Sequence, residues 1–282
     1  MALGQYYGIV AASGVSDSVT PVFDDNGSAT CGFSIRKLDS SYSGDCLRVR
    51  EDSGDTEADI GFDSDGYLDT SALLAHCSSN NGFITTWYDQ SGNTYDLTQT
   101  NTSYQPQIVN SGVLVETNGK ASILFDGSDD YLQLSDAGSN ALGNGSTTEV
   151  NHYSVQSIAA ATGCMISSKV GTWEEYFITH ASSTNPSSVN AGTLVYYKNG
   201  SDISTYTQAT VYAAFNIASQ TLATITGLNM QHFKSAGSAQ LKVGGPYIEM
   251  NMNMQELLFW KVSNLPTQAD VETNINSYFS IY

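Results

Sequence analysis

The stretch FITTWYDQSGN, residues Phe83–Asn93, combines two patterns that together predict a strand followed by a tight turn. Its first half is rich in β-branched and aromatic residues, which favour a pleated, half-buried strand. Its second half contains Asp, Ser, Gly and Asn, which favour turns, and Gly92 can supply a positive φ. We expect Trp87 or Tyr88 to pack inward and Asp89 and Asn93 to hydrogen-bond the turn. The competing hypothesis makes Asp89 an acid at the tip of a functional site.

The chain on both sides of this stretch consists of short apolar segments separated by turn residues about every ten positions. That spacing is typical of an all-β sandwich or barrel. The candidate strands include Thr20–Phe23 near the start of the chain, Ala209–Asn216 in its second half, and the long apolar segment Ile248–Trp260 near its end. Since the composition nowhere shifts enough to mark a linker, we expect residues 31–282 to form a single domain. Residues 1–30 are expected to complete a sheet or to dock the protein onto something larger.

Two helices are predicted within this β-rich chain. A short one near residues 69–76 has Asp69 at its N-cap position. A second covers residues 267–281, where Val271, Ile275, Tyr278 and Phe279 share one helical face. The start of this helix resembles a capping box, with Thr267 three residues before Asp270. We expect the C-terminal helix to seal one edge or end of the sandwich.

The charge is strongly acidic, with 28 acids against 10 bases and a net charge of −18. This balance argues against partners such as nucleic acids and anionic membranes, which require a basic surface. No apolar run reaches the roughly 18 residues of a membrane span. The first residues lack a basic segment followed by a long apolar one, so no secretory signal is expected.

Metal and cofactor motifs are not predicted. Cys31, Cys46, Cys77 and Cys164 form no C-x-x-C pair and have no histidine at ligand spacing, so we expect buried free thiols, with two disulfides as the alternative. The segment Asp63–Gly66 resembles part of a calcium loop but lacks the remaining ligands. We interpret it as a turn, with a calcium site as the alternative.

The arginines Arg48 and Arg50 lie on one face of a predicted strand whose other face carries Leu47 and Val49. An acid-rich run, residues 51–59, follows directly. Because guanidinium and carboxylate groups form bidentate pairs, we expect an internal clamp here, with an anion site as the alternative.

Several motifs, taken in order, resemble known families. The segments Ser40–Gly44, Leu47–Arg50, Asp59–Phe62 and Ile84–Asn93 resemble the first half of the catalytic domain of fungal-type α-L-arabinofuranosidase B. The same block, continued through Gln105–Val109, Phe125–Leu132 and Gln255–Leu257, is similar to laminin-G and concanavalin A-like domains of bacteriophage structural proteins. Both resemblances imply an antiparallel concanavalin A-like β-sandwich, or jelly roll. The chain lacks the adjacent paired cysteines of the glycosidase, and the similarity to it ends near residue 110.

The second resemblance covers more of the chain, and it implies a non-enzymatic virion protein on the outer surface of the particle. Such a capsid decoration, fibre or tail component would bind other virion proteins, namely capsid, portal or tail, would form a homo-oligomer, and would display a lectin-like domain to host-surface glycans. The alternatives are a glycoside hydrolase of the α-L-arabinofuranosidase type and a carbohydrate-binding module of a secreted enzyme. No catalytic residue is assigned. The candidate carbohydrate-binding residues are Trp173, Glu174, Glu175 and Tyr176, where carboxylates adjoin aromatic rings.

Overall fold

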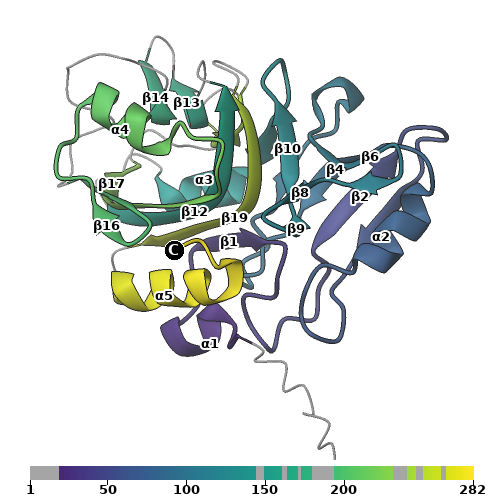
Figure 1. Cartoon of the computed structure of the whole chain (residues 1–282), viewed down its shortest axis with the longest axis horizontal. Coiled ribbons are helices and arrows are strands. Elements are labelled where there is room, and N and C mark those ends of the chain that lie inside the picture. Colours follow the sequence, from purple (N-terminus) through teal and green to yellow (C-terminus); the bar gives the residue numbers. More distant parts are fainter. Residues whose placement is uncertain are drawn as a thin grey trace, which may run out of the picture.

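The structure is a computed structural model, which describes residues 19–143, 149–160, 164–170, 173–179, 194–230, 240–245, 250–261 and 265–282 (Figure 1). Strands dominate these residues, and every pairing between them is antiparallel. The strands form two layers that enclose a core. The prediction of an all-β antiparallel sandwich with few helices is therefore confirmed.

The first layer is built around the two longest neighbouring strands of the chain, β12 and β19 (Figure 1). Hydrogen bonding connects, in order, β16 (Ser201–Asp202), β15 (Val195–Lys198), β17 (Thr221–Asn229), β12 (Glu149–Ala160) and β19 (Asn251–Lys261). The far edge of β19 pairs with β1 (Cys31–Ser34) along its second half and with β10 (Ile123–Asp126) along its first half. The first and last strands of the structure, β1 and β19, thus lie side by side in one sheet.

The second layer contains most of the N-terminal half and a hairpin from the middle of the chain. Its order is β3 (Glu57–Ile60), β2 (Leu47–Glu51), β4 (Gly82–Trp87), β5 (Leu97–Thr98), β11 (Leu132–Leu134), β18 (Lys242–Val243), β13 (Cys164–Val170) and β14 (Trp173–Thr179). Two short strands, β6 (Gln107–Asn110) and β7 (Val113–Leu114), form a hairpin, and β6 also pairs with both β4 and β10. Strand β6 therefore connects the two layers at one end.

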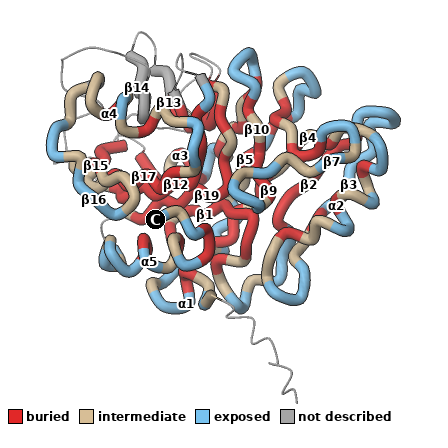
Figure 2. Tube along the Cα trace, in the orientation of Figure 1, coloured by how far each residue is buried: buried red, intermediate tan, exposed pale blue. Residues whose placement is uncertain are grey.

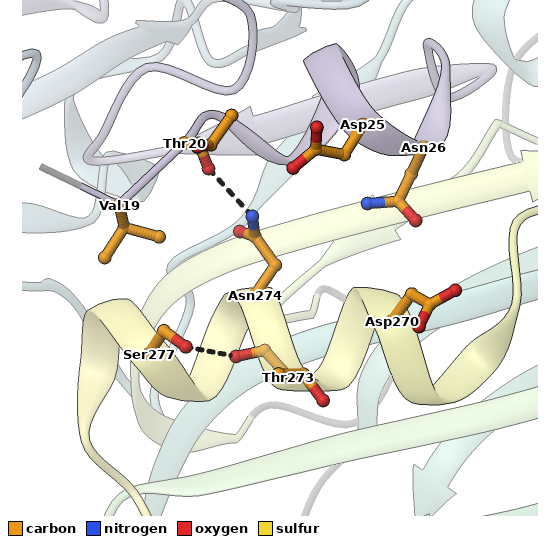
Figure 3. Close-up of a pocket in the computed structure, with 8 residues that line it drawn as sticks. All are labelled: Val19, Thr20, Asp25, Asn26, Asp270, Thr273, Asn274 and Ser277. Carbon is orange, nitrogen blue, oxygen red and sulfur yellow. Dashed lines mark hydrogen bonds between the residues drawn. The ribbon is translucent and has the colours of Figure 1, made fainter.

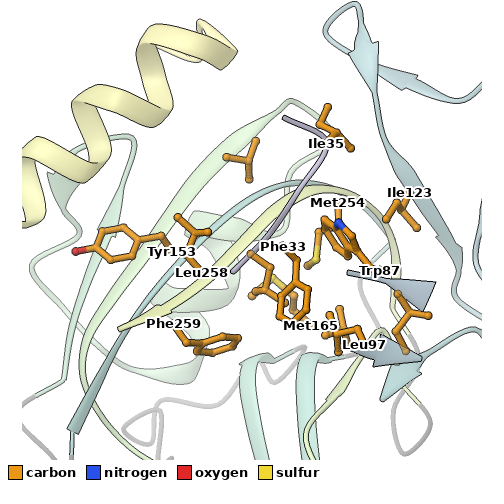
Figure 4. Packing of buried hydrophobic residues seen from close by; sticks show 14 of the residues in the cluster. Phe33, Ile35, Trp87, Leu97, Ile123, Tyr153, Met165, Met254, Leu258 and Phe259 are labelled. Carbon is orange, nitrogen blue, oxygen red and sulfur yellow. The ribbon is translucent and has the colours of Figure 1, made fainter. Parts of the chain in front are cut away.

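The core lies where the inner faces of the layers meet (Figure 2). Phe33 of β1 and Trp87 of β4 are both fully buried, and their ring centroids are 5.8 Å apart. Met165 and Phe259 extend this contact, as Figure 4 shows. Because burying each large apolar side chain contributes roughly 1.5–3 kcal/mol, this double-layer core supplies most of the free energy that holds the sandwich together.

The predicted helices are both present. Helix α2 (Thr70–Cys77) begins after Asp69, whose carboxylate accepts a hydrogen bond from the Ala72 N–H at 2.9 Å. Helix α5 (Gln268–Phe279) buries the predicted apolar face against the outer side of the first layer (Figure 1). Thr267 stands at its N-cap position, but its side chain makes no capping hydrogen bond. Ser280 ends the helix in the left-handed conformation, with a φ of 55°.

Two predicted strands are helices in the structure, which corrects the sequence-based expectation. Helix α1 (Val22–Asn26) replaces the strand expected at 20–23: its two adjacent residues Val22 and Phe23 are both buried, and the Asp24 N–H donates to the carbonyl of Pro21, the N-cap residue, at 3.1 Å. Helix α4 (Gln208–Phe215) replaces the strand expected at 209–216. There the Thr207 hydroxyl caps the N–H of Thr210 at 3.2 Å.

The remaining elements are short. Helix α3 covers Asp136–Leu142, a 3₁₀ turn (η1) covers Thr102–Tyr104, and a separate hairpin consists of β8 (Glu116–Thr117) and β9 (Lys120–Ala121). Among the described residues, Cys31, Cys46 and Cys77 are buried free thiols. Within that same part of the chain, no helix has both the length and the apolar character needed to cross a membrane.

Candidate functional site

The turn after β4 is held by a single carboxylate. Asp89 is only 3% exposed, and its Oδ1 accepts hydrogen bonds from the N–H groups of Gly32 at 2.9 Å and Ser91 at 3.0 Å. Its Oδ2 accepts from the Ser91 hydroxyl at 2.7 Å and from the Tyr95 N–H at 3.0 Å. Gly92 has a φ of +87°, which a residue with a side chain adopts at a cost. Four donors occupy this carboxylate, so it has little capacity left for a substrate.

The residues next to Asp89 join the same turn to the rest of the fold. Asn93 donates from Nδ2 to the Thr30 carbonyl at 3.1 Å. Trp87 is fully buried in the core, while the Tyr88 hydroxyl donates to Asp59 at 2.6 Å. The stretch that the sequence places at the centre of the fold therefore connects the second layer to the segment that leads into β1.

The two arginines of β2 make different contacts. Arg48 forms a bidentate pair with Asp59 of β3, with both nitrogen–oxygen distances at 2.9 Å. Arg50 is 7% exposed, donates to Gln105 at 2.7 Å and Asp55 at 2.6 Å, and lies 5.1 Å from the centroid of the Phe83 ring. Since both guanidinium groups have internal partners, the geometry favours the clamp over an anion site.

A second acidic turn, formed by Asp126, Asp129 and Asp130 after β10, gathers three carboxylates within 4.8 Å of one another. They line a pocket of about 270 Å³ together with residues from β4, β6 and the 3₁₀ turn. Burial, with the charges of Asp126 and Asp129, raises the pKa of Asp130 to about 7, although the Asp126 N–H that it accepts opposes the shift. A carboxyl with such a pKa can exchange a proton near neutral pH.

The acidic turn also has a plain structural role. Asp130 accepts the Asp126 N–H at 3.0 Å, and Asp126 accepts the Ser128 N–H at 2.7 Å. In the sequence this segment is part of a family motif, which does not single out Asp130 as the carboxyl with a raised pKa. The signal that could have found it is the density of acids, with three carboxyl groups in five residues directly after a buried strand. Three oxygen ligands in close proximity could also hold a cation, although exposed acidic groups often cluster without one.

The predicted carbohydrate-binding residues Trp173, Glu174, Glu175 and Tyr176 lie on strand β14. The backbone register opposes Glu174 to Lys169 and Glu175 to Ser168 of β13. Through β13 and β18, this hairpin is the far end of the second layer, remote in the strand order from the turn at Asp89. The side chains of these four residues lie outside the described part of the structure.

A further pocket lies between α1 and α5 (Figure 3). Its polar side chains largely bond to the chain itself, as Asn274 donates to the Thr20 carbonyl at 2.8 Å and Ser277 donates to the Thr273 carbonyl at 2.7 Å. The pocket has carboxylates from Asp25 and Asp270 but neither a base nor an aromatic ring in its lining. It therefore lacks the flat apolar surface against which a sugar ring packs.

Comparison with known proteins finds similarity to a catalytic-domain family over part of this chain. A family model described as "Alpha-L-arabinofuranosidase B, catalytic" matches residues 25–137. This segment runs from α1 to α3 and contains both the turn at Asp89 and the acidic turn. No curated protein matches the chain closely enough to count as a relative.

Solved structures are similar over most of the chain. A GH54 α-L-arabinofuranosidase soaked with a cyclic sulfate inhibitor is 16% identical, covers 90% of this chain and has a TM-score of 0.55. A Glu-to-Gln mutant of a GH54 α-L-arabinofuranosidase soaked with 4-nitrophenyl α-L-arabinofuranoside is 15% identical over the same 90%, with a TM-score of 0.57. An arabinofuranosidase complexed with arabinofuranosyl-α-1,2-xylobiose is 16% identical over 90%, with a TM-score of 0.54. In all three cases the match spans 64% of the other chain.

These findings correct the sequence-based expectation of a bacteriophage structural protein. The family model and the three structures carry arabinofuranosidase descriptions, whereas the expected virion function, non-enzymatic role, particle location and capsid, portal or tail partners find no counterpart in them. The symmetric assembly expected of a virion protein loses its basis in the same way. The motifs shared by the two families report a common sandwich, which explains why the sequence alone favoured the wrong one.

Proposed function

We propose that this protein is a glycoside hydrolase that acts on α-L-arabinofuranosides. The observation that carries the proposal is the match of residues 25–137 to a family model for the catalytic domain of α-L-arabinofuranosidase B. Fold similarity to three arabinofuranosidases over 90% of the chain supports it. The proposal includes a sandwich of the concanavalin A-like jelly-roll type, a single domain over residues 31–282, and a secreted location.

Glycoside hydrolysis generally requires two carboxyl groups, one that protonates the leaving oxygen and one that attacks the sugar or activates water. Many glutamates of the described residues are already committed to the fold. Glu256 is fully buried and accepts hydrogen bonds from Arg36 at 2.8 Å and Ser34 at 2.7 Å. Glu51 accepts the N–H groups of Ser53 at 2.8 Å and Gly54 at 2.9 Å. These carboxylates hold their own loops and sheets, so they are poor candidates for catalysis.

We therefore assign the essential glutamate to β14, either as Glu174 with Tyr176 contacting the sugar or as Glu175 with Trp173, because alternate residues of a strand share one face. Two lines of reasoning support this choice. The strand combines carboxylates with aromatic rings, the pairing that sugar sites use. One of the similar structures is also a Glu-to-Gln mutant of an arabinofuranosidase soaked with an aryl arabinofuranoside. Asp130, with its raised pKa, is the competing candidate for the proton donor.

Release of 4-nitrophenol from 4-nitrophenyl α-L-arabinofuranoside tests the proposal. The unmodified chain should turn the substrate over, and either Glu174→Gln or Glu175→Gln should lower kcat by about 10²–10⁴-fold, the usual contribution of a positioned acid or base. Glu57→Gln is a matched control, since Glu57 lies on the exposed edge strand β3, and its kcat should be unchanged.

Two results would overturn parts of the proposal. If the folded, unmodified chain does not hydrolyse aryl arabinofuranosides, the proposed function is refuted. Loss of turnover in Asp130→Asn, with both β14 variants fully active, would transfer the acid role to the acidic turn. Circular dichroism and thermal unfolding of each variant distinguish lost chemistry from lost structure.

A further inference from the structure

A groove on the outer side of the first layer lies between α5, the β8–β9 hairpin and the loop before α2. It consists of two adjoining pockets of about 450 and 260 Å³, which share Asp63, Tyr67 and Tyr278. The rings of Tyr67 and Tyr278 form its wall, with centroids 5.1 Å apart. The groove is remote from β14 in the strand order and takes no part in the proposed hydrolysis.

The β8–β9 hairpin is held firmly in place above this wall. Its two-residue turn has Asn118 at a φ of 52° and Gly119 at 69°, as an Asn-Gly hairpin turn requires. Gln255 of β19 donates from Nε2 to three carbonyls of the hairpin, those of Thr117, Lys120 and Ala121. Asn118 also donates to the Phe279 carbonyl at the end of α5, at 3.2 Å. These bonds fix where the side chain of Lys120 begins.

Lys120 is one of two lysines of the groove, with Lys37, that have no counter-ion among the described residues. Its ammonium group lies 4.3 Å from the centroid of the Tyr278 ring and 5.9 Å from that of Tyr67. In the described part of the chain it forms neither a hydrogen bond nor an ion pair through this group. Burial and the nearby Arg36 guanidinium lower its pKa, because both disfavour the charged form.

The neighbouring Arg36 shows the contrast. Its guanidinium makes a bidentate pair with Glu256, at 2.8 and 3.1 Å, and also donates to Asn274 at 2.9 Å. Arg36 and Glu256 therefore neutralise each other, while Lys120 adds an uncompensated positive charge. Lys37 is half-buried as well but lies 6.0 Å from the centroid of the Phe62 ring, whereas Lys120 alone of the two contacts the tyrosine wall.

The hydroxyl groups of the wall are also unused. Within the described residues, the Tyr67 and Tyr278 hydroxyls make no hydrogen bond, although Tyr278 is only 7% exposed. Three acids line the groove as well, namely Asp63, Asp65 and Glu116. Asp63 is engaged by the N–H groups of Asp65 at 3.0 Å and Tyr67 at 2.9 Å, while Glu116 is exposed and lies beyond ion-pair distance of Lys120. Asp65 is exposed too. The unpaired groups of the tyrosine wall itself, the Lys120 ammonium group and the two hydroxyls, can all donate hydrogen bonds.

We propose that this groove binds a carboxylate-bearing sugar, a uronate residue of an acidic polysaccharide. The ammonium group of Lys120 and the two tyrosine hydroxyls would donate to its carboxylate and ring hydroxyls, and the exposed part of the Tyr67 ring would pack against its C–H groups. The carboxylate would supply the counter-ion that Lys120 lacks. The inference rests on the proposed function only in that both concern polysaccharides, since the groove needs no hydrolysis to bind.

Isothermal titration calorimetry with two xylotrioses tests this site, one neutral and one carrying a glucuronic acid branch. Neither contains arabinose, so turnover cannot interfere. The unmodified chain should bind the acidic oligosaccharide at least about 10-fold more tightly than the neutral one, the ratio that corresponds to about 1.4 kcal/mol. Lys120→Met, which keeps the apolar stem, should abolish that preference, and Lys120→Arg should retain most of it. Tyr67→Phe should weaken binding of the acidic sugar several-fold.

The matched control is Lys198→Met, which removes a lysine from the separate strand β15 and should leave both affinities unchanged. Equal affinity of the unmodified chain for the two sugars would overturn the inference, as would an acidic preference that survives in a folded Lys120→Met variant. A chain that binds the uronate but does not cleave aryl arabinofuranosides would refute the proposed function alone. The reverse pattern would refute this inference alone.

Discussion

Two turns of this protein begin in the same way and differ in how their carboxylates are used. The turn at Asp89 follows β4, and the acidic turn of Asp126, Asp129 and Asp130 follows β10. In the first, one carboxylate accepts four hydrogen bonds, two of them from the N–H groups of Gly32 and Tyr95 beyond the turn itself. In the second, three carboxylates share a few donors that all belong to the turn.

The two turns differ in the number of hydrogen bonds that each carboxylate accepts and in the pKa of the buried Asp130. A carboxylate that accepts several N–H bonds from separate segments, as Asp89 does, acts as a structural anchor. In the acidic turn, burial, together with the charges of Asp126 and Asp129, raises the pKa of Asp130 to about 7. The groove shows a similar difference between two cations: Arg36 is paired with Glu256, whereas Lys120 has no ion-pair partner among the described residues.

Removing the anchor should give the largest effect. Asp89→Ala leaves the N–H groups of Gly32, Ser91 and Tyr95 without their acceptor, and each unsatisfied buried donor costs about 1–3 kcal/mol. We expect the free energy of unfolding to fall by at least about 3 kcal/mol, measured by urea denaturation with tryptophan fluorescence. Asp129→Ala in the acidic turn, where the carboxylate is exposed, should change it by less than about 0.5 kcal/mol.

The milder variant Asp89→Asn tests the rejected alternative. It retains one acceptor oxygen and should destabilise the fold by about 1–3 kcal/mol. Loss of sugar binding or of turnover in Asp89→Asn at an unchanged melting temperature would restore Asp89 as an active-site acid, against its role as an anchor.

The glycines of the two turns should rank next. Gly92 and Gly127 have similar φ angles, +87° and +77°, so an alanine at either position pays about 1–2 kcal/mol for a left-handed conformation. A Cβ at Gly92 meets nothing within 4 Å, whereas at Gly127 it would lie 2.8 Å from the backbone nitrogen of Asn251. Gly127→Ala should therefore lower the free energy of unfolding by about 1–3 kcal/mol more than Gly92→Ala, measured in the same urea titration. Equal losses would mean that β10 and β19 move apart without cost.

The sequence predicted the first turn well because its signals are local. The residue types of Asp89, Gly92 and Asn93 specify a turn, and the β-branched run before them specifies a strand. The helices at α2 and α5 were likewise predicted from a cap residue and an apolar face. The strand predicted at 209–216 was wrong because short apolar runs fit either element, and only the cap at Thr207 distinguishes them.

The rest could not be predicted because it depends on pairings distant in sequence. The donor from Gly32 lies 57 residues from Asp89, and Arg36 meets Glu256 across 220 residues. The groove needs Tyr67, Lys120 and Tyr278 to converge from three separate elements. No spacing rule in the sequence encodes these meetings, so the place of Lys120 between the two tyrosine rings could not be foreseen.

The pH dependence of stability should give the smallest effect and the sharpest distinction between the turns. Burial raises the pKa of Asp130 from its ordinary value of 3.8 to about 7, so the folded state binds this proton more strongly than the unfolded chain. Its contribution to stability is therefore complete at low pH and is lost as the pH rises from about 4 to about 7.

Asp130→Asn cannot ionise and should escape this loss. The melting temperature of the variant, relative to the unmodified chain, should rise by a few degrees between about pH 4 and about pH 8, since 1 kcal/mol corresponds to about 2–4 °C. A relative melting temperature that does not change with pH would show that Asp130 titrates like an exposed carboxyl, and the two turns would then differ in donors but not in charge.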